Sequence, residues 1–273
     1  MFTRLDPNDA AIGAGTSFFS DEVQYNLIHL ISESNDSLCL KTFDGKMIFA
    51  QTPGHNGWLW ISREVAKVER KSMIEELAIH LKGVSLPGIS SEPEITAMFA
   101  EVFSNRNGIP FYSDMTLEAY HCPKVIKPVN VTGKLQKATQ QNVVVIAEYL
   151  AGFLNDALGT KVEPNTQLDK AKTMVDAGGL YHWMVDDQPV SMANISHRSP
   201  RHARINTVYT PDEHRKKGYA SALVAELCCI IETEKLVPML YADIKNPTSN
   251  KVYQNIGFLK KGKIAEIKFS TSS

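Results

Sequence analysis

Hydrophobic positions in the second half of the chain recur with two alternating periods, which predict a domain of mixed α and β structure. Apolar residues three to four positions apart, as in 141–159, indicate amphipathic helices, whereas short apolar or alternating runs indicate strands. The predicted order ααβββαβαβ has one strand–helix–strand crossover in its middle, so the sheet should be mixed rather than doubly wound. Helices are expected at 141–159, 167–179, 218–235 and 249–257, and strands at 179–186, 188–196, 203–210, 239–244 and 258–269.

The first half of the chain shows the same two kinds of pattern but no recognisable catalytic constellation. Its periodic segments again predict helices and strands in a mixed α/β arrangement. The helices are expected at 23–34, 65–83 and 92–106, and the strands at 37–43, 46–52 and 57–62.

A break in both patterns separates the two halves. The segment 121–133 contains Pro123 and Pro128, which interrupt helices and sheet ladders alike, and it ends at Gly133. A chain of 273 residues is long enough for two domains. We therefore expect an N-terminal α/β domain over 1–128 and a second domain over 129–273.

The charge balance and the N-terminal sequence exclude several classes of function. The 29 Lys and Arg residues nearly balance the 30 Asp and Glu residues, for a net charge of -1. This balance gives no global field for nucleic acid or an anionic membrane, so any basic site must be local. The N-terminus has no long apolar segment of the secretory type, and no run is long enough for a membrane span. We therefore expect a soluble cytoplasmic protein.

The cysteines give no sign of a metal site or a disulfide framework. They form no CxxC pair and no Cys/His ligand spacing, which favours reduced thiols and a protein without metal. Cys228 and Cys229 lie in a helical pattern, where inert packing is a better interpretation than a covalent acyl-cysteine route. The four cysteines are Cys39, Cys122, Cys228 and Cys229.

Residues 214–221, HRKKGYAS, follow a predicted strand and open a predicted helix, which favours binding of an anion. The first turn of a helix leaves backbone N–H groups without intrahelical partners, and the helix dipole adds partial positive charge there. Gly218 and the small residues Ala220 and Ser221 would let phosphate oxygens approach these amides. The three cations at 215–217 add charge beside the amides.

Two other segments resemble phosphate-binding motifs but lack decisive residues. GAGTSF at 13–18 has Phe18 in place of the third glycine, and no predicted strand precedes it. GFLKKGKI at 257–264 has Ile264 where a Walker loop needs Ser or Thr for magnesium, and it also follows a strand pattern. We therefore assign no phosphate site to either segment.

The downstream segment NPTSNKVY adds an amide side chain and a phenol to the predicted anion site. Asn246 and Pro247 suit a turn, and Ser249 suits the N-cap of the following short helix. Asn250 and Tyr253 are three residues apart, so they should be neighbours on that helix. A phosphate cradle, an amide and a phenol together favour a long cofactor that carries phosphate.

These segments together resemble the GNAT acyltransferase family (Gcn5-related N-acetyltransferases). The matching features are the strand RINTVYT, the loop RKKGYA and the segment DIKNPTSNKVYQNIGF, and the resemblance covers about 134–273. It implies an α/β fold whose central mixed sheet is splayed between its fourth and fifth strands. It also implies that acetyl-CoA, the acyl-donor cosubstrate, lies in the opening.

The resemblance further implies a role for individual residues. Backbone groups at the end of the strand 203–210 would receive the acetyl and pantetheine portions, and amides of the following loop would receive the pyrophosphate. Asn246 would contact the pantetheine, with Asn250 nearby. Tyr253 matches the family tyrosine that protonates the sulfur of coenzyme A. The residues assigned to the cofactor are Val208, Tyr209, Thr210, Arg215, Lys216, Lys217, Gly218, Tyr219, Ala220, Ser221, Asn246 and Asn250.

The N-terminal half is similar to a bacterial GNAT group in which this half is a decayed copy of the same fold. The similarity is carried by GVSLPGISSEPEITAMFAEVF at 83–103. This half has no RxxGxA-like loop, so we expect no second cofactor site in it. Its expected role is to cover the acceptor side of the C-terminal cleft.

The general base of an acyl transfer stays open at this point. The reaction requires a deprotonated amine, donors for the oxyanion and a proton for the leaving thiolate. Backbone N–H groups near Val208 are the natural oxyanion donors, but the strand ARINTVYT contains no carboxylate to serve as base. The candidates are His182, His197, His202, Asp243 or a water chain.

The sequence thus predicts an acetyl-CoA-dependent N-acetyltransferase in which a primary amine attacks directly. The acceptor would be a small molecule or a peptide, with no role for nucleic acid, membrane or metal. One alternative is a non-catalytic acyl-CoA-binding or regulatory module, which the missing strand carboxylate keeps open. A transferase for a longer acyl group is another.

Overall fold

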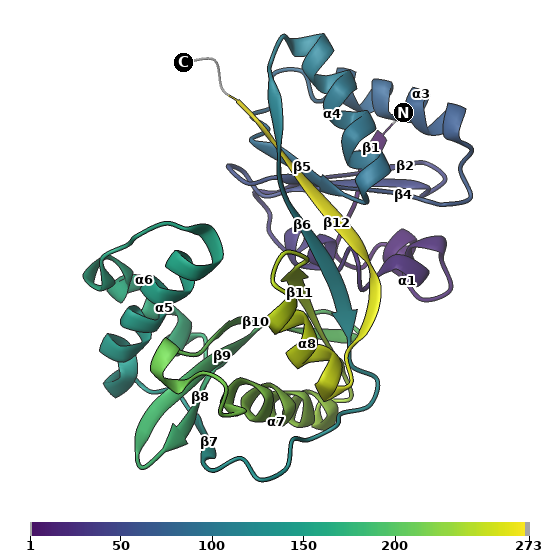
Figure 1. Ribbon diagram of the computed structural model, residues 1–273. Coiled ribbons are helices and arrows are strands. Elements are labelled where there is room, and N and C mark those ends of the chain that lie inside the picture. Colours follow the sequence, from purple (N-terminus) through teal and green to yellow (C-terminus); the bar gives the residue numbers. More distant parts are fainter. Residues whose placement is uncertain (1, 271–273) are drawn as a thin grey trace. The chain divides into compact units, whose positions relative to one another are not determined.

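The protein is described here by a computed structural model covering residues 2–270, and its internal contacts divide the chain into two units (Figure 1). The N-terminal unit consists of Met1–Tyr120 together with Ala242–Asn246 and Lys260–Ser273. The C-terminal unit consists of His121–Tyr241 and Pro247–Leu259. The N-terminal unit therefore takes its last strand from the end of the chain.

The N-terminal unit is a mixed sheet with helices on both faces. Its strands lie in the order β1-β2-β3-β4-β5-β12-β6, with β4 parallel to β5 and β12 antiparallel to β5. The predicted strands and helices of this half are confirmed, whereas β1, β5 and β6 have no counterpart among the predictions. The elements are β1 (Phe2–Arg4), η1 (Ala10–Ile12), α1 (Ser17–Asp21), α2 (Leu27–Ser32), β2 (Leu38–Thr42), β3 (Met47–Gln51), β4 (Gly57–Ile61), α3 (Lys67–His80), β5 (Gly88–Ser91), α4 (Pro93–Asn107), β6 (Phe111–His121) and β12 (Leu259–Phe269).

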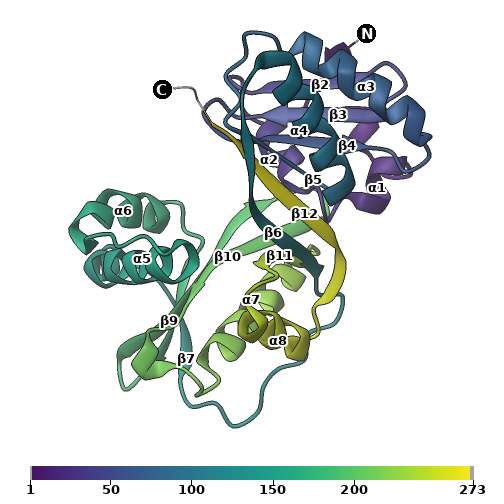
Figure 2. The ribbon, with the colours of Figure 1, turned by 45° about the horizontal axis from the view of Figure 1, so that its top comes forward.

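Two hydrophobic layers hold this unit together. Helices α3 and α4 cover one face of the sheet, where Phe49 and Leu59 pack with Phe99 in a buried cluster (Figure 2). On the other face, Phe18 of α1 meets Trp60 edge-on, with ring centroids 5.3 Å apart. Trp60 also donates its indole N–H to Asp21 at 3.0 Å, so the polar end of the ring is satisfied although the residue is buried.

The C-terminal unit has the predicted element order as far as α8, preceded by the short strand β7, whereas the last predicted strand, β12, lies in the N-terminal unit. Its strands lie in the order β11-β10-β9-β8-β7, and only the pairing of β10 with β11 is parallel, so the predicted mixed sheet is confirmed. The elements are β7 (Lys134–Lys137), η2 (Gln140–Asn142), α5 (Val143–Leu158), η3 (Pro164–Gln167), α6 (Leu168–Asp176), β8 (Leu180–Val185), β9 (Gln188–Arg198), β10 (His202–Tyr209), η4 (Asp212–His214), α7 (Tyr219–Thr233), β11 (Val237–Asp243) and α8 (Pro247–Ile256).

Helices cover both faces of this second sheet. On one face, α5 and α6 pack against β8, β9 and β10 through a buried cluster that includes Ile146, Leu150, Leu180 and Met192. On the other face, α7 packs against β8, β9 and β10 and also contacts α8. Figures 1 and 2 show α5 with α6 and α7 with α8 on opposite sides of these strands.

The start of α8 corrects one expectation from the sequence. The helix begins at Pro247, two residues before Ser249, so Ser249 lies inside the first turn and is not the N-cap. Proline is favoured at the first helical position because its fixed φ suits the helix and its missing N–H would have had no helical partner there. Pro247, which the sequence placed in a turn, is thus the first residue of the helix that Ser249 was expected to cap.

The two halves of the chain repeat the same order of elements, although the last strand, β12, is part of the N-terminal unit. Leaving aside the 3-10 turns, β1 to β6 with α1 to α4 and β7 to β12 with α5 to α8 both run βααβββαβαβ along the described chain. Two copies of one fold would produce this repetition. The origin of the N-terminal half as a decayed copy stays a prediction.

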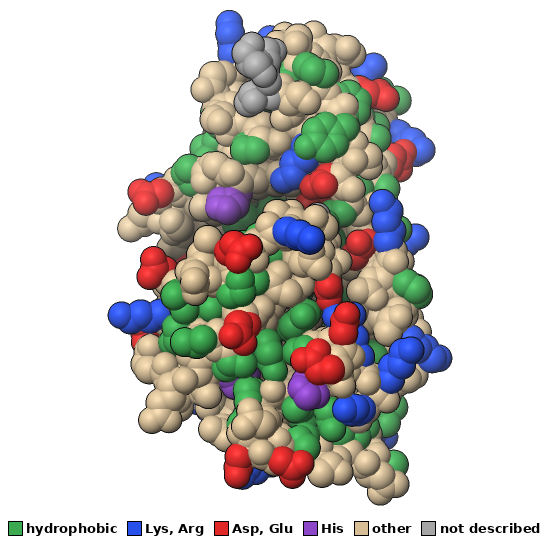
Figure 3. Space-filling model, turned by 60° about the vertical axis from the view of Figure 1, so that its left-hand side comes forward, with side chains coloured by type: hydrophobic (Ala, Val, Ile, Leu, Met, Phe, Trp, Pro, Cys, Tyr) green, Lys and Arg blue, Asp and Glu red, His purple; other side chains and the backbone are tan. Residues whose placement is uncertain are grey.

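The surface charge and the apolar length of the helices can be described directly. Acidic and basic side chains are interspersed over the face of the molecule drawn in Figure 3. No helix within residues 2–270 is both long enough and apolar enough to span a bilayer.

Candidate functional site

The candidate site begins where β10 and β11 separate. The two strands pair through His202 with Val237, Ala203 with Pro238 and Arg204 with Met239. Within these fully described strands the parallel ladder stops there, although β10 continues to Tyr209. The sheet of the C-terminal unit is therefore open between its fourth and fifth strands, as the resemblance implied.

A β-bulge disturbs β10 beside this opening. Asn206 pairs with Asn194, and Tyr209 pairs with Met192. Between these pairs β10 has two residues and β9 has one, so β10 carries the extra residue of the bulge. Thr207 has a φ of 51°, which is rare for a β-branched residue. Since a bulge takes its extra residue out of the ladder, the backbone at Thr207 and Val208 is redirected away from β9. The sequence carried no signal for this bulge, because Thr207 is an ordinary strand residue by composition.

The chain past the bulge is fixed by a hydroxyl pair. Ser191 donates its hydroxyl to the carbonyl of Tyr209 at 3.0 Å, and the Ser191 and Thr210 hydroxyl oxygens are 2.8 Å apart. The end of β10 therefore leads into the next loop in a defined direction.

The loop after β10 ends in an uncapped helix N-terminus. Lys216 has a φ of 61° and Gly218, the N-cap of α7, has a φ of 84°. No side chain caps α7, and the first helical bond runs from Ala222 N–H to the Gly218 carbonyl at 3.0 Å. The amides of the first turn are therefore available to an anion. A Cβ on Gly218 would lie 3.0 Å from Val131, so a side chain here would be strained in φ and would require Val131 to move by a few tenths of an ångström.

Arg215 holds this loop together rather than pointing its charge outward. Its Nε donates to the carbonyl of Thr210 at 2.9 Å, and its guanidinium pairs with Asp156 of α5 and, at 2.7 Å, with Asp212. The guanidinium carbon also lies 5.9 Å from the centroid of the Tyr209 ring. The cofactor contact of Arg215 stays a prediction. Asp156 lies far upstream of the loop, so no local pattern could have indicated it.

Lys216 and Lys217 present the remaining positive charge of the loop. Both are exposed, and neither forms an ion pair with another residue in the described chain. They are therefore free to approach a phosphate beside the α7 amides.

Tyr253 is a buried phenol on α8. It is 8% exposed and meets Phe258 edge-on, with ring centroids 5.9 Å apart. Burial raises the pKa of Tyr253 to about 12, because the phenolate would lose its hydration. The phenol therefore keeps its proton at neutral pH, which is the state that a proton donor needs. Asn250 lies one turn earlier on the same helix.

Asn246 closes the turn after β11 and falls within the N-terminal unit. Its backbone N–H donates to the carbonyl of Asp243 at 3.0 Å, and the Asp243 side chain accepts the N–H of Lys245 at 2.9 Å. Asp243, a candidate base, thus serves as a turn acceptor in this structure. The cofactor contact of Asn246 stays a prediction.

The histidine candidates are all buried. His182 of β8 is 1% exposed, and burial lowers its pKa to about 4. It is therefore neutral at pH 7, and its low pKa makes it a weak proton acceptor. His197 and His202 lie in the β9–β10 hairpin, where the backbone N–H of His202 donates to the Ser199 hydroxyl at 3.2 Å. The structure does not single out one of these residues as the general base, and a water chain remains a candidate.

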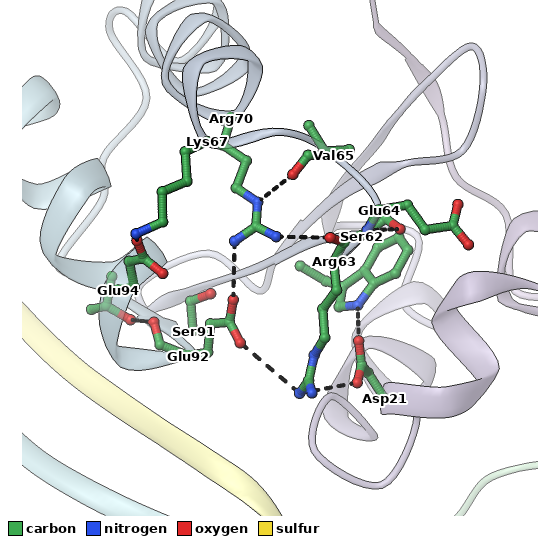
Figure 4. Close-up of polar contacts among 12 residues, drawn as sticks. Asp21, Ser62, Arg63, Glu64, Val65, Lys67, Arg70, Ser91, Glu92 and Glu94 are labelled. Carbon is green, nitrogen blue, oxygen red and sulfur yellow. Dashed lines mark hydrogen bonds and ion pairs between the residues drawn. The ribbon is translucent and has the colours of Figure 1, made fainter.

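The corresponding loop of the N-terminal unit, between β4 and α3, has the opposite polarity. Arg70 donates to the carbonyls of Val65 at 2.8 Å and Arg63 at 3.1 Å, so this loop turns carbonyl oxygens toward a guanidinium (Figure 4). Glu92 lies between the two arginines, 4.0 Å from Arg63 and 3.9 Å from Arg70. No glycine occurs in residues 62–66. These contacts favour the prediction that this unit has no second cofactor site.

Residues 179–266 match the family described as FR47-like protein, which is of the GNAT type. The match begins at β8 and includes the open strands, the loop and α8. Over these residues the chain is similar to the GNAT family. No curated protein matches the chain in sequence.

Solved GNAT structures share the fold over almost the whole chain. A GNAT-family acetyltransferase from Colwellia psychrerythraea has a TM-score of 0.58 at 9% identity and covers 99% of this chain and 100% of its own. A GCN5-related N-acetyltransferase from Kribbella flavida has a TM-score of 0.59 at 14% identity, with 93% and 96% covered. A GCN5-related N-acetyltransferase from Sphaerobacter thermophilus has a TM-score of 0.58 at 12% identity, and the match covers 98% of this chain and 95% of that one. At these identities the likeness establishes the GNAT fold.

Proposed function

We propose that this GNAT protein is an N-acetyltransferase that transfers the acetyl group of acetyl-CoA to a primary amine of a small molecule or peptide by direct attack. The observation that carries the proposal is the continuous path from the bulge of β10 to the uncapped start of α7. Along this path, redirected backbone groups are followed by a loop of exposed lysines and by free helix amides. A thioester linked to a pyrophosphate needs such groups in that order.

The α7 amides and the two exposed lysines would bind the pyrophosphate. The amides of Tyr219, Ala220 and Ser221 supply the hydrogen bonds, while Lys216 and Lys217 add charge. Arg215 keeps the loop in place through Thr210 and the two aspartates. In this arrangement the backbone determines the geometry of binding, and the cations strengthen it.

The chemical step would use the bulge and Tyr253. A bond forms between the amine nitrogen and the carbonyl carbon, and the carbon–sulfur bond breaks. The backbone N–H of Val208 would stabilise charge on the carbonyl oxygen. Tyr253 gives its proton to the leaving thiolate, and the amine proton leaves through a base that is water or one of the candidates above. The raised pKa of Tyr253 keeps the phenol protonated until the sulfur accepts the proton.

A non-catalytic acyl-CoA-binding module is the second candidate. It is favoured by the absence of a carboxylate from β10 and by the low pKa of His182. Release of free thiol from acetyl-CoA would separate the two. The transferase releases thiol only when an amine is present, whereas the binding module releases none with any amine.

We expect the intact chain to bind one acetyl-CoA, because the β4–α3 loop turns carbonyls rather than amides toward its arginine. Isothermal titration with acetyl-CoA measures this stoichiometry directly. Two equal sites would contradict the assignment of the N-terminal unit. The absence of any binding would remove the proposed function.

Asp156→Ala is expected to weaken acetyl-CoA binding about two- to fivefold, the range of an exposed ion pair. Charge alone predicts the opposite, because the change removes an anion near the phosphate loop. The loss follows if Asp156 acts by fixing Arg215. Glu148→Ala, on the same helix, removes a charge without that contact and should leave the dissociation constant unchanged. Tighter binding by Asp156→Ala would show that Arg215 contributes only charge.

A further inference from the structure

Arg204 of β10 is a partly buried cation without a carboxylate. Its Nε donates to the Ser196 hydroxyl at 3.1 Å, and that hydroxyl in turn donates to the Arg204 carbonyl at 3.2 Å. Among the residues that the structure describes, no other hydrogen bond and no ion pair is made by its guanidinium. Burial lowers the pKa of Arg204 below the usual arginine value, which reflects the cost of desolvating an unpaired cation.

The orientation of Arg204 is built into the sheet. The register between β9 and β10 shifts between Arg204 and Ile205, because Ser196 is an extra residue on β9. This bulge places the Ser196 hydroxyl against the Arg204 Nε. One edge of the guanidinium is thereby fixed, and the two Nη atoms keep their four N–H donors.

A second set of donors lies beside Arg204. Asn206 is two residues further along the strand, so its side chain is on the same face. The Nδ2 of Asn194 donates to the side-chain Oδ1 of Asn206 at 3.1 Å. The two N–H groups on the Nδ2 of Asn206 therefore remain as donors for another partner. This face of β10 therefore offers guanidinium and amide donors, and no carboxylate is paired with the guanidinium among the described residues. Such a set suits a carboxylate.

The position of these donors separates them from the phosphate loop. Arg204 is the last residue of β10 that pairs with β11, so it lies where the opening starts. Val208 follows four residues later, beyond the bulge at Thr207, and the α7 amides come beyond the other end of β10. A cofactor whose pyrophosphate binds at α7 and whose thioester lies at Val208 leaves Arg204 to another ligand.

We propose that Arg204 binds a carboxylate of the acyl acceptor, so that the substrate is a primary amine that also bears a carboxylate. This inference rests on the proposed acetyl transfer for its substrate, and on the unpaired donors of Arg204 and Asn206 for its chemistry. Arg204 and Asn206 lie before the bulge at Thr207 on the same strand. The amine and the carboxylate of the acceptor are therefore separated by several bonds.

The test compares 6-aminohexanoate with pentylamine, which has the same chain without the carboxylate. Dissociation constants are measured by isothermal titration with and without saturating coenzyme A. We expect the wild-type protein to bind 6-aminohexanoate at least tenfold more tightly than pentylamine. Arg204→Met should remove this difference, and Arg204→Lys should remove most of it, because an ammonium cannot form the two parallel bonds of a guanidinium. Equal binding of the two ligands by the wild-type protein would overturn the inference.

Arg198→Met is the matched control. Arg198 lies in the same hairpin but is paired with Glu234 through two bonds of 2.6 and 2.9 Å, so its loss should leave the preference intact. Persistence of the preference in Arg204→Met would also overturn the inference. If thermal unfolding shows that the Met variant does not fold, the Lys variant decides. Thiol release from acetyl-CoA with either amine tests the transferase itself. A protein that prefers 6-aminohexanoate but releases no thiol would contradict the proposed function and leave the carboxylate site standing.

Discussion

Gly218→Glu is expected to weaken acetyl-CoA binding at least about 100-fold, to the limit of detection by isothermal titration. Two physical effects act together. Gly218 has a φ of 84°, which costs a residue with a Cβ about 1–2 kcal/mol, and the added Cβ would lie 3.0 Å from Val131. The loop must therefore shift. The new carboxylate would also stand beside the amides that would bind the pyrophosphate, where a second negative charge is unfavourable.

Two further variants separate charge from strain and from general damage. Gly218→Ala introduces the strain without the charge and should cause a smaller loss than Gly218→Glu. Gly159→Glu introduces the same charge at the C-cap of α5, where φ is 64° and nothing lies within 4 Å of an added Cβ. This control should bind acetyl-CoA like the wild-type protein. Undiminished binding by a folded Gly218→Glu variant would remove the α7 start from the site.

Tyr253→Phe is expected to lower kcat about 100-fold, the lower range for loss of a general acid, with little change in the dissociation constant of acetyl-CoA. The substitution removes one oxygen from a buried ring and retains the edge-on contact with Phe258. Steady-state thiol release gives kcat, and titration gives the affinity. An unaltered kcat would exclude Tyr253 from the mechanism.

Tyr149→Phe is a closely matched control. Tyr149 is also buried, in α5, and its pKa is likewise raised to about 12 by desolvation. Its hydroxyl donates to the carbonyl of Pro189, so its loss should cost about 1 kcal/mol of stability without the fall in kcat.

The pH dependence of kcat gives an independent check on Tyr253. The proton donor is active below its pKa, and an ordinary tyrosine would begin to lose its proton near pH 10. Because burial raises the pKa of Tyr253 to about 12, kcat should not fall through tyrosine ionisation up to pH 10. An alkaline loss centred near pH 10 that disappears in Tyr253→Phe would contradict the burial described here.

The C-terminal unit followed from local signals in the sequence. The helix α7 and the strand β10 each carry an apolar period that belongs to one element type, and glycines mark the end of α5 and the start of α7. The loop between β10 and α7 was recognisable because its cations and its glycine are contiguous. The opening of the sheet came from family resemblance rather than from any residue pattern.

Features that depend on distant partners were not predictable. The first four residues of β6 are all exposed, whether aromatic or polar, so this strand shows no alternation of buried and exposed positions there, and one of its neighbours in the sheet is β12, from the other end of the sequence. Asp156 likewise gains its role from Arg215, which lies 59 residues away in the sequence. Local pattern identifies elements, whereas these contacts depend on how the elements are brought together.

The pairing of β12 with β5 opposes the order in which the chain is made. Ile267 lies opposite Ile89, and most of the protein is synthesised between them. Until the last strand leaves the ribosome, β5 therefore presents an open edge of backbone donors and acceptors. Such edges are sites of mispairing in nascent chains. The N-terminal unit, although made first, can complete its sheet only after β12 has been translated.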